Sequence, residues 1–311
     1  MYYVSKKKII KIVGKNFFSF ILLFNFISIT YGDVVTSIRP LGFIASAIAN
    51  GVTNTKILIP YGVSPHDYSL KPSDIKKIKT ADFLIWIGSD METFLQKPLE
   101  YLPSEKVITL SEDSSIKDLL LKSSDSSNVE NKKDFQLHHY DNSKYNMHIW
   151  LSPDIALIIA NIIHNRLVDL YPKYKKQLGI NLSRFDDKLI KTDKNIAKIL
   201  KSVKDRKYFV FHDAYGYFEK RYKLASLGYF TINPIIKPSA KRLYEIRLML
   251  IQKKAVCVFV EPQFRTTIIK NTDVRMVTLD PLGNDIALNK GSYMEFLKTL
   301  SNQFKSCLDK K

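Results

Sequence analysis

Short apolar runs alternate with longer amphipathic stretches along most of the chain. In the first half, four runs predict strands: 34–38, 55–59, 82–87 and 106–110. Three stretches between them predict helices: 40–50, 72–80 and 91–101. The run at 82–87 is apolar at almost every position, which is typical of a strand buried on both faces. The alternation predicts a parallel sheet with helices on both sides.

The second half repeats this pattern after two long helical stretches. Ser152 as N-cap, Pro153 and an acid in the first turn predict the start of a helix that ends before Pro172. A second helix, from about 174 to 203, has apolar residues on one face only. Four further strands are predicted at 207–211, 227–232, 255–260 and 275–279. The helices around them are predicted at 214–222, 239–253, 263–270 and 293–308.

The predicted fold class is therefore α/β with two lobes, each a mainly parallel sheet with flanking helices, joined by a long rigid backbone helix. We expect the N-terminal lobe over 33–171, the connecting helix over 172–205 and the C-terminal lobe over 206–311. Residues 111–146 are rich in Ser, Asp, Asn and Lys and predict a mobile surface loop in the first lobe. Ligands of open parallel sheets bind at the carboxyl ends of strands, so the cleft between the lobes is the expected site.

The amino-terminal segment 1–32 has the layout of a secretory signal peptide. It contains no acid, and five Lys precede an almost wholly apolar run from Phe17 to Ile29. This run of 13 residues is too short to span a bilayer core of ~30 Å as a helix, although an uncleaved anchor is the alternative. No Cys lies near the expected cleavage point after Gly32, so we expect an exported protein that is not a lipoprotein.

The charge of the chain changes this picture little. A net charge of +18, from 48 basic and 30 acidic residues, would first indicate a nucleic acid or an anionic membrane as partner. Only 9 of the basic residues are Arg, the residue that base and phosphate recognition favours. Loss of five Lys with the signal peptide lowers +18 to +13, and the remaining Lys are spread along the chain. We therefore expect no nucleic-acid partner.

The few Cys and His residues are more informative. Cys257 lies in a buried-strand run and Cys307 near the end of the last helix; an oxidising compartment favours their pairing, and two buried free thiols are the alternative. His66, His148 and His212 all lie at predicted strand ends or helix starts, and Asp280 ends a further strand. Three neutral imidazoles and one oxygen suit tetrahedral Zn²⁺, although each His alone is more often structural.

Five sequence blocks carry a more specific signal. They are His-Asp-Tyr-Ser-Leu-Lys-Pro-Ser-Asp (66–74), Asn-Met-His-Ile-Trp-Leu-Ser-Pro (146–153), Phe-His-Asp-Ala-Tyr-Gly-Tyr-Phe-Glu-Lys (211–220), Glu-Pro-Gln-Phe-Arg (261–265) and Thr-Leu-Asp-Pro-Leu-Gly (278–283). In this order, and over essentially the whole mature chain, they resemble the periplasmic zinc-binding proteins of high-affinity zinc ABC transporters, in the cluster A-I metal-binding family.

The resemblance implies a function and a site. It implies two lobes joined by a backbone helix, Zn²⁺ in the cleft, and delivery of the ion in the periplasm to a membrane permease with a cytoplasmic ATPase. It implies that His66, His148 and His212 ligate the metal and that Cys257 and Cys307 form a disulfide. We expect a monomer that is a receptor and not an enzyme.

Two departures from the family pattern affect the ligand set. Some relatives carry a Glu just before the first ligand His, whereas this chain has Pro65. We therefore expect Asp280 as the fourth ligand, with a water as the alternative and Asp285 ranked lower. Relatives often carry a loop rich in His and acidic residues, whereas the corresponding loop of this chain has only two His and scattered Asp and Glu. An auxiliary loop site is a weaker expectation than solvated side chains; its residues would be His138, His139 and Asp141.

Three other functions compete with a zinc receptor. A manganese or iron receptor of the same architecture would use more carboxylates, because harder ions prefer oxygen ligands. A secreted zinc hydrolase would need an open coordination position and a general base, for which Glu261 at a strand end is a candidate. The chain has no His-Glu-x-x-His helix, which argues against the hydrolase. A metal-dependent adhesin is the third alternative.

Overall fold

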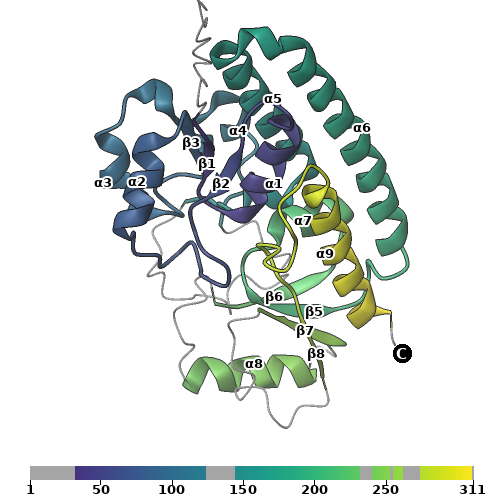
Figure 1. Ribbon diagram of the computed structural model, residues 1–311. Helices are drawn as coiled ribbons and strands as arrows, with labels where there is room; N and C mark the ends of the chain where they lie inside the picture. The colour runs from purple at the N-terminus through teal and green to yellow at the C-terminus, as the bar shows by residue number, and fades with distance from the viewer. Residues whose placement is uncertain (1–31, 124–143, 232–239, 253–254, 262–273, 310–311) are drawn as a thin grey trace, which may run out of the picture. The chain divides into compact units, whose positions relative to one another are not determined.

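The computed structural model describes residues 32–123, 144–231, 240–252, 255–261 and 274–309 (Figure 1). The chain beyond residue 30 forms one compact unit. The expected signal peptide, apart from Gly32, and the predicted helical turn at 263–270 lie outside the described residues. No helix in the described part of the chain is long and apolar enough to cross a membrane.

The first sheet has four parallel strands in the order β2-β1-β3-β4. They are β1 (Val34–Thr36), β2 (Thr55–Ile57), β3 (Phe83–Trp86) and β4 (Val107–Thr109). Phe83 and Ile85 of β3 join the main core, to which α1 (Arg39–Ile48) also contributes. Leu84 and Trp86 face a second cluster, formed with α2 (Pro72–Thr80) and α3 (Thr93–Glu100). The prediction of a strand buried on both faces is therefore confirmed.

The second sheet has the same topology, with parallel strands in the order β6-β5-β7-β8. Its strands are β5 (Tyr208–His212), β6 (Ser226–Thr231), β7 (Cys257–Val260) and β8 (Arg275–Thr278). One face packs on α7 (Gly216–Tyr222) and α9 (Ser292–Leu308), as part of the main core. The other face is covered by α8 (Ala240–Gln252), whose Leu250 contributes to that cluster. Figure 1 shows α8 and α9 on opposite sides of this sheet.

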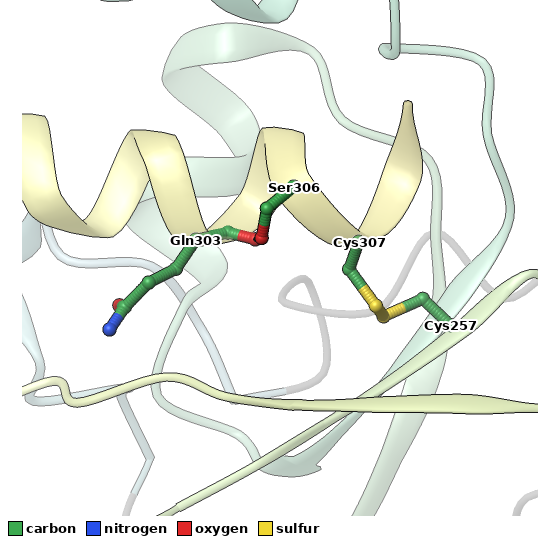
Figure 2. Close-up of a disulfide and its surroundings, with 4 residues drawn as sticks. All are labelled: Cys257, Gln303, Ser306 and Cys307. Carbon is green, nitrogen blue, oxygen red and sulfur yellow. A yellow bond between two sulfur atoms is a disulfide. The ribbon is translucent and has the colours of Figure 1, made fainter. Parts of the chain in front are cut away.

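The two cysteines link the second sheet to the last helix. Cys257 at the start of β7 forms a disulfide with Cys307 of α9 (Figure 2). Their Cα atoms are 6.0 Å apart and both residues are buried. The expected pairing is confirmed, and the bond fixes the end of α9 to a strand that lies inside the sheet.

Two long helices follow the first sheet in the chain. The helix α5 (Pro153–Leu170) starts as predicted, because the Ser152 hydroxyl accepts a hydrogen bond from the Ile155 amide at 3.3 Å. The helix α6 (Lys175–Leu200) contacts α1 and α5 on the side of the first sheet, and α7 and α9 on the side of the second. The Asn181 amide donates to the carbonyls of Ile48 and Asn50, at 2.9 and 2.8 Å. The predicted two-lobe α/β fold with a long helix is confirmed.

The loop predicted over 111–146 begins too early, because regular structure continues past residue 111. Leu110–Glu112 form a 3₁₀ turn and Ser114–Lys117 form α4, which is held to the core by the buried Ile116. Leu121 is also buried, and Lys122 pairs with Tyr145 across an isolated bridge. The segment is mainly polar, so these few buried apolar residues gave only a weak signal in the sequence. His138, His139 and Asp141 lie outside the described residues. Three further 3₁₀ turns are Ser104–Lys106, Ile149–Leu151 and Pro172–Tyr174.

Candidate metal centre

The candidate site is built at the carboxyl ends of strands, as the sequence predicts. His212 is the last residue of β5, and Glu261 directly follows β7. These strands are neighbours at the point where the strand order of the second sheet reverses, which is where open α/β sheets bind ligands. His66 comes from the loop between β2 and α2, and His148 directly precedes the 3₁₀ turn Ile149–Leu151.

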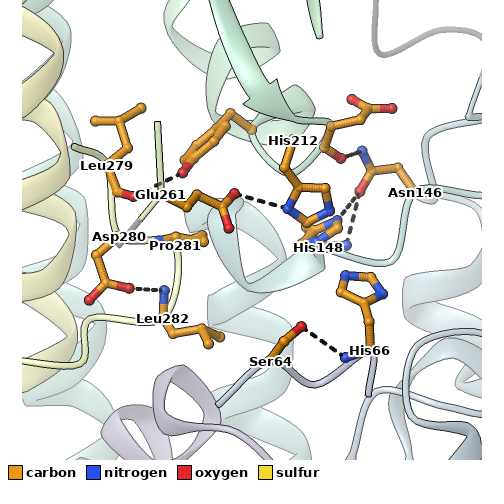
Figure 3. Close-up of polar contacts among 12 residues, drawn as sticks. Ser64, His66, Asn146, His148, His212, Glu261, Leu279, Asp280, Pro281 and Leu282 are labelled. Atoms are coloured by element: carbon orange, nitrogen blue, oxygen red, sulfur yellow. Dashed lines mark hydrogen bonds and ion pairs between the residues drawn. The ribbon is translucent and has the colours of Figure 1, made fainter. Parts of the chain in front are cut away.

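Three imidazoles from these separate segments meet (Figure 3). The ring centroid of His66 lies 5.5 Å from that of His148 and 5.2 Å from that of His212. The centroids of His148 and His212 are 4.7 Å apart. One nitrogen from each ring lies within 4.8 Å of the other two. His148 and His212 are buried and His66 is half-buried, so the cluster is largely closed to solvent.

Hydrogen bonds orient two of the rings from behind. The Nδ1 atom of His212 lies 2.9 Å from Oε1 of Glu261, a carboxylate that can only accept. The Nδ1 atom of His148 lies 2.8 Å from Oδ1 of Asn146. That Asn oxygen also accepts from the His148 amide, while its Nδ2 donates to the Asp213 carbonyl, which fixes the amide orientation. Nδ1 is therefore the donor in both rings, and Nε2 carries the free lone pair.

The unpaired nitrogens indicate a missing ligand. Among the described residues, the Nε2 atoms of His66 and His212 are buried without a hydrogen-bond partner. An unsatisfied buried polar atom costs on the order of 1–3 kcal/mol, so such a pair in one place points to a binding function. Burial, with a contribution from His212, lowers the pKa of His66 to about 3. Burial also lowers the pKa of His148 well below its ordinary value. Both rings are therefore neutral at pH 7, the form that binds metals.

The space between the rings fits a small ligand. The cavity has a volume of about 20 Å³. It is lined by Ser64, Pro65, His66, His148, Trp150, His212, Glu261, Pro281 and Leu282. Such a volume holds about one water-sized particle and fits a single metal ion.

Asp280, the expected fourth ligand, is not brought among the three imidazoles. Its carboxylate accepts hydrogen bonds from the Leu282 amide at 2.9 Å and from the Asn284 amide at 2.5 Å. The Asn284 side chain donates to it as well, at 3.1 Å. Figure 3 shows this carboxylate turned toward its own turn and away from the imidazoles. Both oxygens are occupied by that turn, and this is why a residue at a strand end does not reach the site.

Two residues gain roles that the sequence did not predict. Glu261, a candidate general base for a hydrolase, has an oxygen bound to His212. Asn146 supports His148 in the same way. A carboxylate directly after a buried strand was the available signal for Glu261, because such a group needs a partner. Asp285, ranked lower as a ligand, instead accepts a hydrogen bond from the Tyr61 hydroxyl at 2.8 Å.

The protein has two parallel sheets and a long helix that contacts the elements around both. A cluster of buried imidazoles lies at strand ends. Together these features define a two-lobe α/β protein with a candidate metal centre. Residues 34–307 match the family described as zinc-uptake complex component A, periplasmic. The chain belongs to this family, as the resemblance of its sequence blocks implies.

Curated relatives agree with this assignment. The high-affinity zinc uptake system protein ZnuA of Yersinia pestis is 50% identical over 305 residues, covering 93% of this chain and 95% of the relative. The protein of the same name from Buchnera aphidicola is 41% identical over 311 residues, covering 95% and 96%.

Solved structures share the fold. A crystal structure of ZnuA has a TM-score of 0.73 at 24% identity and covers 89% of this chain and 99% of that one. The periplasmic zinc binding protein TroA from Treponema pallidum has a TM-score of 0.72 at 19% identity, with the same coverage.

Proposed function

We propose that this chain is a periplasmic receptor that captures Zn²⁺ at His66, His148 and His212 and delivers it to the membrane permease of an ABC transporter with a cytoplasmic ATPase. The observation that carries the proposal is the convergence of three imidazoles, with one nitrogen from each within 4.8 Å of the other two. Membership of a zinc-uptake family supports the same ion and the same location. The activity is capture and handover, without bond chemistry.

A water is the fourth ligand in this proposal. Among the described residues, the candidate ligand cluster contains no carboxylate, and the carboxylate of Asp280 is held by its own turn. The cavity between the imidazoles fits a metal ion. A set of three nitrogens favours zinc over the harder manganese and iron(II) ions, which prefer oxygen ligands.

The organisation of the chain fits capture outside the cytoplasm. In this proposal residues 1–32 are a cleavable signal peptide, 33–171 and 206–311 are the two lobes, and 172–205 connect them. The mature protein acts as a monomer. The disulfide between Cys257 and Cys307 is typical of an oxidising compartment such as the periplasm.

A binding titration tests the proposal. The mature chain should bind one Zn²⁺ tightly, and Mn²⁺ should compete poorly. His66→Ala and His212→Ala should each weaken zinc binding by more than the 10–100-fold typical of a lost supporting partner, because a ligand itself is removed. His164→Ala is the matched control, since His164 lies on α5 outside the cluster and pairs with Asn165 at 3.1 Å. Unchanged affinity in both ligand variants would exclude this site.

A further inference from the structure

The segment between β8 and α9, residues 280–289, runs along elements of the first lobe; we call it the strap. Six of its acceptor atoms accept hydrogen bonds from donors outside it. Two donors come from the loop after β2: Tyr61 Oη donates to Asp285 Oδ1 at 2.8 Å, and the Gly62 amide donates to Asn284 Oδ1 at 3.0 Å. Trp150 Nε1 donates to the Pro281 carbonyl at 2.7 Å. From α1, Ser46 Oγ donates to the Asn289 carbonyl at 2.9 Å, and Arg39 donates to the carbonyls of Gly283 and Ile286. The strap is thus bonded along most of its length to α1, to the loop after β2 and to Trp150.

The strap has a built conformation. Asp280 holds its turn through the amides of Leu282 and Asn284, and Asn284 donates back to Asp280 while accepting from Gly62. Gly283 has φ +64°, and a Cβ there would lie 2.9 Å from the rings of both Phe43 and Phe296. Only glycine fits this position without strain or displacement. Asp280 therefore acts as a positioning residue for Asn284, four residues further along.

The strap also bounds the candidate metal site. Pro281 and Leu282 line the cavity from one side, and Ser64, Pro65 and His66 line it from another. Tyr61 and Gly62, which bond to the strap, belong to the same loop as His66 and lie five and four residues before it. His66 is the least buried of the three imidazoles. The strap is therefore connected directly to the loop that carries this ligand.

We propose that the strap is a latch that controls zinc exchange, and this rests on the proposed zinc binding at the three His residues. The hydrogen bonds Tyr61–Asp285 and Gly62–Asn284 hold the loop that carries His66 in its ligating position. Zinc enters and leaves when these bonds break and the loop moves away from the strap. The Tyr61 side of the latch is accessible, since this residue is 65% exposed, whereas Asn284 is 6% exposed. The outer bond is consequently the one that opens first.

The test measures exchange kinetics and affinity in the full mature chain. Zinc release from the loaded protein is followed by stopped flow with an excess of a fluorescent chelator, and zinc association is measured separately. Tyr61→Phe and Asp285→Ala should each raise the release rate roughly two- to tenfold, the range of a net hydrogen-bond energy. The release rate of the double variant should be close to that of each single variant, because both substitutions remove the same hydrogen bond. Tyr101→Phe, at a residue 87% exposed, should change nothing.

A latch also predicts a change in the association rate, which a bond that only strengthens zinc binding does not. Association should accelerate together with release, so that Kd changes less than the release rate. Unchanged release in Tyr61→Phe and Asp285→Ala, or faster release with unchanged association, would overturn the latch. A folded wild-type chain that binds no zinc would overturn the proposed function and the latch together. Tight one-to-one zinc binding with either of the first two results would overturn the latch alone.

Discussion

Removal of the Glu261 carboxylate tests whether the residue behind His212 tunes the metal centre. The carboxylate accepts from His212 Nδ1 at 2.9 Å, and both side chains are almost fully buried, with exposed fractions of 6% and 3%. A hydrogen bond to a charged group contributes about 1.5–3 kcal/mol, and each 1.4 kcal/mol corresponds to a tenfold change in Kd. Loss of the group should therefore weaken zinc binding roughly 10–100-fold, which matches the typical effect of partners of metal-binding His residues.

The two available substitutions divide this effect. Glu261→Gln keeps the shape and one carbonyl acceptor for Nδ1–H but removes the negative charge, so we expect a loss near tenfold. Glu261→Ala also removes the acceptor that fixes the tautomer and orientation of His212, so we expect a loss near one hundredfold. Glu295→Gln removes the same charge at an exposed position of α9 and is the matched control.

The assay is competition for zinc against a chelator of known affinity at pH 7.5, with stoichiometry measured in parallel. Thermal unfolding of each zinc-free variant shows that the chain is folded under these conditions. A folded Glu261→Ala variant that retains one zinc per chain with wild-type affinity would show that Glu261 does not support the site. If Glu295→Gln weakens binding as much as Glu261→Gln, the effect is one of overall charge and the role of Glu261 is again excluded.

Three further predictions concern the disulfide, the burial of His66 and the hydrogen bonds of Asn181. Loss of the Cys257–Cys307 bond, which closes a separation of 50 residues, should lower the free energy of unfolding by up to about 4 kcal/mol; equal denaturant midpoints with and without reductant would contradict this. The zinc-free protein should lose stability as pH falls from about 6.5 toward 3, because the pKa of His66 is about 6.5 in the unfolded chain and about 3 in the folded one. The folding equilibrium constant should change by up to about tenfold per pH unit. In denaturant unfolding at several pH values, His66→Asn should flatten this dependence. Asn181→Ala should cost on the order of 1–3 kcal/mol in denaturant unfolding, since it leaves the carbonyls of Ile48 and Asn50 without their donor; a change below 0.5 kcal/mol, the size of a surface substitution, would argue against this contact.

Local sequence patterns predicted the elements well. The predicted helix 72–80 has the bounds of α2, and the Ser152 cap forms as expected. Strand ends were less accurate, because buried apolar residues continue past the end of the regular strand. Leu58 and Ile59 are buried beyond β2, and their amides still donate to the carbonyls of Thr36 and Ser37. His66, His148 and His212 could be singled out from the sequence because they follow predicted strands or precede a helix. Their meeting depends on the packing of the two sheets, because His66 follows a strand of the first sheet and His212 ends a strand of the second.

The support of the site could not be predicted in the same way. Glu261 reaches His212 because β7 lies next to β5 in the sheet, and this strand order is set by long-range packing and not by local pattern. The direction of Asp280 depends on the turn that it forms with Leu282 and Asn284, including the positive φ of Gly283. Side-chain direction after a strand end is a property of such turns, which the polar composition of a segment does not specify.

The long helix α6 has a consequence for recognition by other proteins. With 26 residues it is about 39 Å long, and its contacts with α1, α5, α7 and α9 couple the surroundings of both sheets. A large rotation of one sheet against the other would have to break the packing of a single continuous helix. Loaded and empty forms should then have nearly equal radii of gyration. A permease that distinguishes the two forms has to recognise a few side chains around the mouth of the site and not the outline of the whole molecule.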